Sequence, residues 1–100
     1  MAKGESRCRQ IDRADATVVW DEPDDPRGNR RKVWDHGLTE DEVESVLLDE
    51  DALAERSKSH PQNCLAFGYT YTDRYIIVAW EILDENEPVI RPITAYEPEK

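Results

Sequence analysis

The end of one helix and the start of another, only a few residues apart, constrain this chain more than any other feature. Gly37 can adopt the left-handed backbone conformation that closes a helix. Thr39 and Glu42 have the Thr-x-x-Glu spacing of a capping box, which satisfies two free N–H groups at a helix start. Leu38 and Val43 stand where a hydrophobic staple closes over that box. The segment therefore predicts two helices that meet at a fixed angle.

The apolar pattern predicts one small α+β domain over residues 14–100, preceded by a flexible tail over residues 1–13. The expected order is β-α-α-β-β-β-β, with strands over 17–20, 52–57, 64–71, 74–83 and 89–96 and helices over 29–36 and 39–49. Both faces of strand 74–83 are apolar, so we expect it at the centre of the sheet. Pro92 cannot donate to a ladder, so the last strand should lie at an edge or expose that side. Both helices should pack on one face of a mainly antiparallel sheet.

Charge is distributed unevenly along the chain. The net charge is -10, which opposes nucleic-acid binding over the surface as a whole. Residues 27–36 nevertheless carry four Lys or Arg against the single acid Asp35, whereas residues 37–51 carry seven acids and no base. A cationic face suits an anionic ligand, and an anionic helix suits a basic partner. Both runs are also what ordinary solvated surfaces contain.

The chain has two cysteines, Cys8 and Cys64, which are too few and too far apart for a disulfide framework. The sequence therefore predicts free thiols in a reducing cytoplasm. It contains no apolar run long enough to cross a bilayer and no secretory signal, so we expect a cytoplasmic protein with no membrane partner. His36 and His60 do not combine with the cysteines at the paired spacing of a zinc site, and the chain has no Gly-rich phosphate loop. We accordingly predict neither metal nor cofactor.

A series of short motifs, taken in order, resembles the BrnT-like toxins of type II toxin–antitoxin systems. The motifs are Trp20-Asp21, Asn29–Lys32, His36-Gly37-Leu38-Thr39, Phe67-Gly68, Asp73-Arg74 with the strand that follows, and Ile90–Tyr96. The resemblance covers about residues 17–97. It implies a RelE-like fold, cleavage of RNA without a metal, and neutralisation by a cognate DNA-binding antitoxin. The acidic helix, residues 39–51, is the surface on which we expect a basic antitoxin to dock.

Three residues are candidates for catalysis of such a reaction: Lys32, His36 and Arg91. Cleavage needs a group to carry the 2′-hydroxyl proton and cations to hold the charge of the phosphorane. Imidazole groups titrate near neutral pH, so His36 could carry the proton, or its ring could merely cap the helix. Lys32 shares a helix face with His36, or it is an ordinary solvent-facing residue. Arg91 lies on an apolar strand and could bind phosphate or form a structural salt bridge.

Four further residues are candidates for contacts with phosphate or RNA: Arg31, Lys58, Arg74 and Trp20. Arg31 belongs to the basic segment, and the family position alone favours Lys58. Arg74 follows a tight turn, where a surface arginine needs no function. Trp20 could stack on a base, although a tryptophan beside an apolar run more often belongs to the core.

The sequence thus predicts a toxin-like, metal-independent ribonuclease component of a toxin–antitoxin pair. The family's arginine at the end of the last strand is Tyr96 here, so the alternative is a catalytically inert protein-interaction module that keeps the BrnT-like fold. The first prediction requires Lys32, His36 and Arg91 to converge in space.

Overall fold

The computed structural model describes residues 3–98, and in this part of the chain three α-helices, one 3-10 helix and five strands are present. In chain order they are α1 (Lys3–Gln10), η1 (Arg13–Asp15), β1 (Thr17–Val18), α2 (Asn29–Asp35), α3 (Glu40–Leu47), β2 (Leu53–Arg56), β3 (Cys64–Tyr69), β4 (Tyr75–Asp84) and β5 (Val89–Tyr96). The protein therefore belongs to the α+β class. Every helix and strand expected from residue 17 onward is present.

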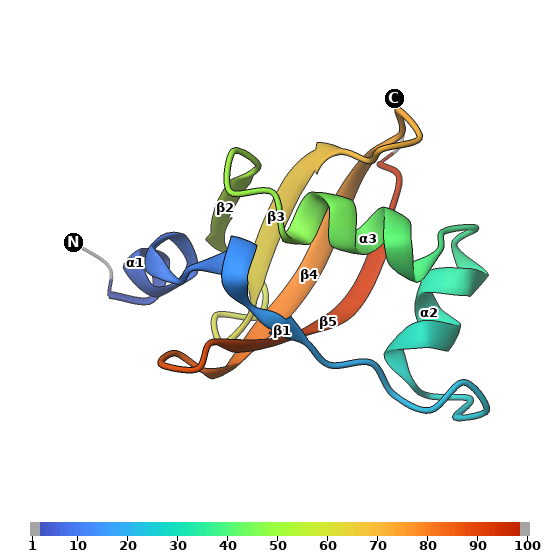
Figure 1. Ribbon diagram of the computed structural model, residues 1–100, viewed down its shortest axis with the longest axis horizontal. Helices are drawn as coiled ribbons and strands as arrows, with labels where there is room; N and C mark the ends of the chain where they lie inside the picture. Colours follow the sequence, from blue (N-terminus) through green and yellow to red (C-terminus); the bar gives the residue numbers. More distant parts are fainter. Residues whose placement is uncertain (1–2, 99–100) are drawn as a thin grey trace.

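The five strands form one mixed sheet in the order β1-β5-β4-β3-β2 (Figure 1). β4 is the central strand, as its two apolar faces predict. β1 runs parallel to β5, and the other neighbours are antiparallel. β1 pairs only with Val89 and Ile90, so β5 has no strand neighbour on that side where Pro92 lies. Pro92 has no N–H to donate to a neighbouring strand, so it fits on a side of β5 where no strand is paired with it.

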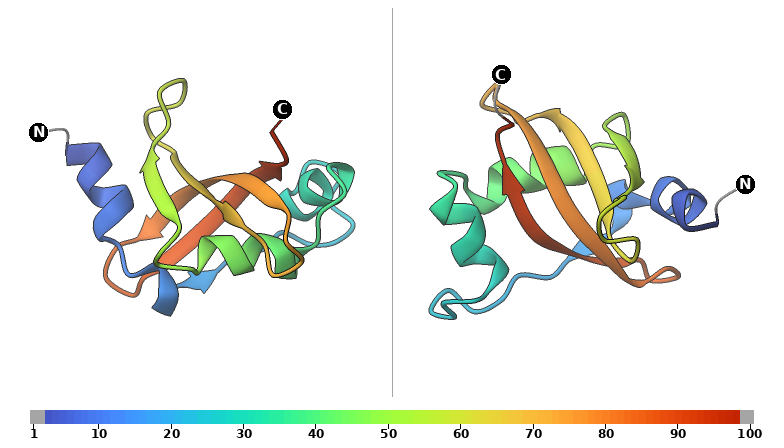
Figure 2. Two further views of the ribbon diagram at one scale, coloured as in Figure 1. Left: turned by 90° about the horizontal axis from the view of Figure 1, so that it is seen from above. Right: turned by 180° about the vertical axis from the view of Figure 1, so that it is seen from behind.

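The helices occupy three different places around the sheet, which corrects the prediction that two of them share one face. α3 crosses the face formed by β3 and β4, whereas α2 lies beside β5 at one edge and α1 lies beside β2 at the other (Figures 1 and 2). The short β1 is the physical reason, because it leaves most of the outer side of β5 without a strand neighbour, and α2 takes that position.

The junction between α2 and α3 has the predicted geometry. Gly37 has a φ of +74°, in the left-handed region that glycine adopts without strain. Thr39 Oγ1 accepts from the Glu42 backbone N–H at 3.2 Å, and Glu42 Oε1 accepts from the Thr39 N–H at 3.1 Å. Leu38 and Val43 are both buried. The capping box is therefore confirmed.

The core lies between α3 and the sheet. Alternate residues of β4, namely Ile76, Val78 and Trp80, are fully buried on this side and meet α3 residues such as Val46. A Cβ atom added at Gly68 would lie 3.4 Å from the Val46 side chain, so the glycine allows α3 to approach β3 closely. The Trp80 side chain fills the middle of this layer.

The opposite face of the sheet has no helix on it in the described part of the chain (Figure 2). The strand register aligns Leu53, Phe67, Ile77 and Tyr96 in one row across β2, β3, β4 and β5. Two members of the row, Leu53 and Tyr96, are 57% and 38% exposed. We call the row the open sheet face. It is an apolar surface that water still reaches.

The N-terminal region differs from its prediction. Residues 3–10, expected within a flexible tail, form α1, while Met1 and Ala2 lie outside the described residues. Cys8 forms a disulfide with Cys64 on β3, with a Cα–Cα distance of 5.7 Å, so the predicted free thiols are wrong. The sequence could not predict this disulfide, because the two cysteines are 56 residues apart and only the fold brings α1 to β3. Disulfides are rare in the cytosol, so a cytoplasmic location stays a prediction.

No helix within the described residues is long and apolar enough to cross a membrane.

Candidate functional site

Asn29 fixes α2 against β5. Its side chain is buried, and its amide Nδ2 donates to the backbone carbonyls of Val19, at 3.0 Å, and Pro92, at 2.8 Å. Its Oδ1 accepts from the Asp21 N–H at 2.8 Å. The amide thus donates to the Pro92 carbonyl of β5, which has no strand neighbour on that side. Only a side chain with both donors and an acceptor can satisfy all three groups, which explains an asparagine at the start of this helix.

Arg91 on β5 lies next to this network and is held by two carboxylates. Its Nη2 donates to Asp21 Oδ2 at 2.7 Å, and its Nη1 donates to Glu81 Oε2 at 3.1 Å. Glu81 is the residue directly opposite Arg91 on β4. The Asn29 backbone N–H, which also donates to Asp21 Oδ2, is the main cause that lowers the pKa of Asp21; Arg91 and Lys32 add to it, and burial opposes them.

Lys32 lies on α2 three residues after Asn29, and its charge is one of the causes that lower the pKa of Asp21. Farther along α2, the His36 ring lies 6.1 Å from the Tyr96 ring, centroid to centroid. Lys32 and His36 are both exposed. We use the name α2–β5 site for Lys32, His36 and Arg91; within it, His36 lies beside Tyr96, five residues beyond Arg91 on β5.

His36 is the C-terminal cap residue of α2, and its backbone N–H donates to the Val33 carbonyl at 3.1 Å. The described structure contains no hydrogen bond from its imidazole ring. The alternative in which the ring caps the helix is therefore wrong, since the backbone closes the helix instead. The imidazole stays accessible to a ligand.

Trp20 and Arg31 contact other side chains of the protein. The Trp20 Nε1 donates to Glu44 Oε2 on α3 at 2.7 Å, and the Arg30 guanidinium lies 5.9 Å from the centre of its ring. The Arg31 guanidinium lies 5.8 Å from the ring of Trp34. These contacts favour the structural interpretation of Trp20. Arg31 is exposed, so it can still meet an anion.

Arg74 connects three parts of the chain. It donates to the Gly37 carbonyl at 2.8 Å and forms ion pairs with Glu42 at 3.3 Å and Glu97 at 2.6 Å. The hydrogen bond to Glu97 is the main cause that raises the pKa of Arg74. Burial alone would raise the pKa of Glu42, but hydrogen bonds from Thr72 and Thr39 and the charge of Arg74 lower it. Arg74 thus holds the α2–α3 junction to the β3–β4 turn, which favours the structural interpretation.

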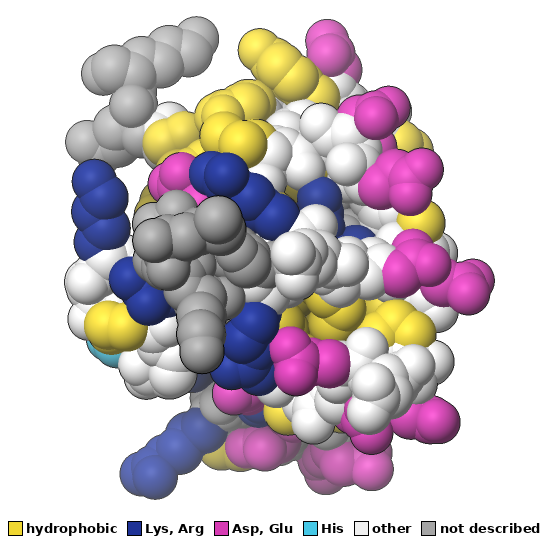
Figure 3. Space-filling view, turned by 90° about the vertical axis from the view of Figure 1, so that its left-hand side faces the viewer, with side chains coloured by type: hydrophobic (Ala, Val, Ile, Leu, Met, Phe, Trp, Pro, Cys, Tyr) yellow, Lys and Arg dark blue, Asp and Glu magenta, His cyan; other side chains and the backbone are white. Residues whose placement is uncertain are grey.

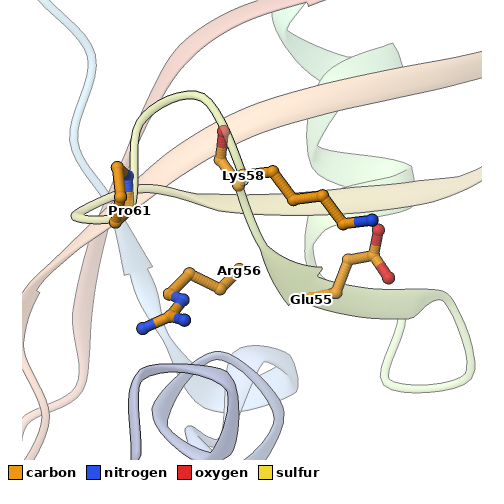
Figure 4. A pocket seen from close by; sticks show the side chains of 5 residues that line it. Glu55, Arg56, Lys58 and Pro61 are labelled. Carbon is orange, nitrogen blue, oxygen red and sulfur yellow. The ribbon is translucent and has the colours of Figure 1, made fainter. Parts of the chain in front are cut away.

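Lys58 lies at the opposite edge of the sheet from the α2–β5 site. It follows β2, which β3 and β4 separate from β5, a span of about 14 Å at ordinary strand spacing. With Glu55, Arg56, Ser57 and Pro61 it lines a cavity of about 230 Å³. Figure 4 shows Lys58 directed toward Glu55, whereas Arg56 points away from both. The fold therefore does not bring Lys58 together with the predicted catalytic residues.

The acidic segment 39–51 is less available to a partner than its charge suggests. Three of its seven acids are engaged within the protein: Glu40 with Arg30, Glu42 with Arg74, and Glu44 with Trp20. The exposed acids of the segment are Asp41, Asp49, Glu50 and Asp51. Seen from the α1 side, most acidic side chains in view lie toward one margin of the molecule, whereas most basic side chains lie on the other half (Figure 3).

Among the described residues, no group of three or more His, Cys, Asp or Glu side chains could hold a metal ion.

The sequence identified Lys32, His36 and Arg91 as candidates but did not identify the two carboxylates that pair with Arg91, Asp21 and Glu81. Asp21 belongs to the Trp-Asp motif, and its position directly after a strand was the available signal. Glu81 could be recognised only once the register set it opposite Arg91. No protein-family model matches this chain, and no curated protein matches its sequence.

Proposed function

We propose that the protein is a toxin-like, metal-independent ribonuclease component of a toxin–antitoxin pair. One observation supports this proposal most strongly: α2 runs beside β5, so the helix that carries Lys32 and His36 flanks the strand that carries Arg91. Lys32 and Arg91 are 59 positions apart in sequence, and the fold brings the elements that carry them to the same edge of the sheet. Arg91 also contacts no residue of the acidic segment 39–51 through an ion pair or hydrogen bond among the described residues.

In this reaction the 2′-hydroxyl of a ribose attacks the neighbouring phosphate and the 5′-oxygen leaves. His36 carries a proton at the reacting oxygens, while Lys32 and Arg91 offset the charge that grows on the phosphorane. A guanidinium has five N–H donors, and the two carboxylates accept from two nitrogens of Arg91. Donors therefore remain for a phosphate, and the ion pairs hold the guanidinium in one orientation.

The test is cleavage of a single-stranded RNA in the presence of EDTA, followed on a gel. Lys32→Ala and Arg91→Ala should each slow cleavage by about 30- to 1,000-fold, which corresponds to roughly 2–4 kcal/mol of transition-state stabilisation. Arg7→Ala, which removes an exposed cation at the far edge of the sheet, is the matched control and should cleave like the wild type. Because Lys32 and Arg91 would contact phosphates directly, RNA binding should also fall as salt rises.

Growth after induced expression in bacteria gives a second readout. The wild type should arrest growth, and Arg91→Ala should not. If the wild type cleaves no RNA and leaves growth unchanged, the ribonuclease proposal is rejected.

The alternative is the catalytically inert protein-interaction module, and two observations favour it. Arg30, Arg74 and Arg91 are each paired with carboxylates, so a phosphate must compete with them. The open sheet face also presents apolar side chains to water, as docking surfaces do. Under this alternative, Leu53→Asp abolishes binding to a protein partner without lowering the free energy of unfolding, and Arg91→Ala has no effect on RNA.

A further inference from the structure

The disulfide between Cys8 and Cys64 lies in the wall of a small cavity. Both cysteines are nearly inaccessible as whole residues, at 2% and 3% exposure. A cavity of about 50 Å³ nevertheless reaches them, lined by Arg7, Cys8, Pro61, Gln62, Cys64 and Ile82. The two cysteines therefore lie in the wall of an opening between α1 and the β2–β3 loop. A thiolate can reach the bond from there once α1 opens locally.

Among the side chains of α1 that the structure describes, few contacts besides this bond hold the helix to the domain. Its sequence, KGESRCRQ, contains one apolar residue, and that residue is Cys8. The Arg7–Glu85 ion pair joins two side chains that are each more than half exposed, so solvent screens it strongly. The Arg9 Nε donates to the Ala54 carbonyl at 3.2 Å. A helix of eight residues without an apolar face is not stable by itself in water.

After α1 the chain is attached to the core through Ile11, which packs against it, and through Arg13. Its guanidinium is buried, donates to the carbonyls of Leu47 and Ala52, and lies 6.0 Å from the centre of the Trp80 ring. These contacts do not depend on the disulfide. Loss of the disulfide would therefore free α1 and leave Ile11, Arg13 and the core in place.

We propose that the Cys8–Cys64 disulfide is a thiol–disulfide exchange site, and that its reduction by a dithiol releases α1 from the sheet. A thiolate of the dithiol attacks one sulfur, the S–S bond breaks, and a mixed disulfide forms. The second thiol of the reductant then resolves it. Two electrons and two protons pass to the protein, which keeps two cysteine thiols, and the reductant leaves as a disulfide. This proposal is independent of the ribonuclease proposal.

Release of α1 changes the edge of the sheet. β2 pairs with β3 on one side only, and Arg9 covers its Ala54 carbonyl on the other. Reduction thus uncovers part of an edge strand, the kind of surface that other chains can pair with. The redox state of one bond therefore controls whether this edge is covered.

The experiment uses the full chain, oxidised or treated with dithiothreitol, and measures hydrogen exchange together with thiol titration. On reduction, amide exchange in α1 should rise by at least about tenfold, while exchange in α3 and β4 should change by less than about twofold. The rate of reduction should be nearly independent of urea below the unfolding midpoint, because only a local opening is needed. Cys8→Ser should show fast α1 exchange without reductant and no response to dithiothreitol.

Three results would overturn the proposal. The first is reduction that occurs only at urea concentrations that unfold the whole domain. The second is unchanged protection of α1 in the fully reduced protein. The third is a Cys8→Ser variant that does not fold, since the core would then depend on the bond. The first and third would make the disulfide a permanent structural cross-link, and the second would show that α1 stays docked without it.

Discussion

Replacement of Asn29 by alanine tests the network that joins α2 to β5. The change removes three side-chain hydrogen bonds, to the Asp21 N–H and to the carbonyls of Val19 and Pro92. Each contributes about 1 kcal/mol net, and burying the abandoned partners adds a desolvation cost. We therefore expect Asn29→Ala to lower the free energy of unfolding by about 3–5 kcal/mol. A domain of this size has roughly 5–15 kcal/mol in total, so the variant should be only marginally folded.

The assay is urea denaturation followed by circular dichroism and by tryptophan fluorescence. Asn86→Ala is the matched control, because Asn86 is exposed in the turn before β5, and its effect should stay within about 0.5 kcal/mol. Hydrogen exchange should also show loss of protection in α2 before loss in β4. If Asn29→Ala costs less than about 1 kcal/mol, its bonds do not hold α2 to the sheet, and the argument for the α2–β5 site falls with them.

Three further predictions concern stability. Thr39→Ala should cost about 1 kcal/mol in urea denaturation through loss of the capping box, and a zero cost would place the helix start elsewhere. Trp80→Ala should cost roughly 3–5 kcal/mol. Trp80→Phe should cost less, since the Trp80 Nε1 has no hydrogen-bond partner among the described residues, and equal costs would contradict this reasoning. The pKa of Glu42 is lowered in the fold, so its contribution is present above the unfolded value of about 4.3 and is lost as pH falls through the folded value. Urea midpoints measured from pH 6 to 3 should therefore fall less in Glu42→Gln than in the wild type, while the exposed Asp41→Asn should follow the wild type; parallel curves for all three would refute the argument.

The helices and strands from residue 17 onward could be predicted because their signals are local. The capping box needs residues three apart, and Gly37 needs only its own backbone freedom. The apolar pattern of β4 identified it as the central strand, since burial on both faces requires it. For the site, local patterns gave the basic face of α2 and the arginine of β5. They could not give the positions of these elements relative to one another.

The tertiary structure decided what depends on residues far apart in the chain. α2 lies at the sheet edge because β1 is only two residues long, and no local pattern fixes how far a parallel pairing extends. Glu81 meets Arg91 because the β4–β5 register sets the two residues opposite each other. The Cys8–Cys64 bond follows from the docking of α1 on β2 and β3. Local propensity acts over a few neighbouring residues, whereas pairing, docking and cross-linking depend on contacts that form only when the whole sheet has assembled. The sequence by itself therefore determined the helices and strands from residue 17 onward, and the tertiary structure determined which of their side chains meet.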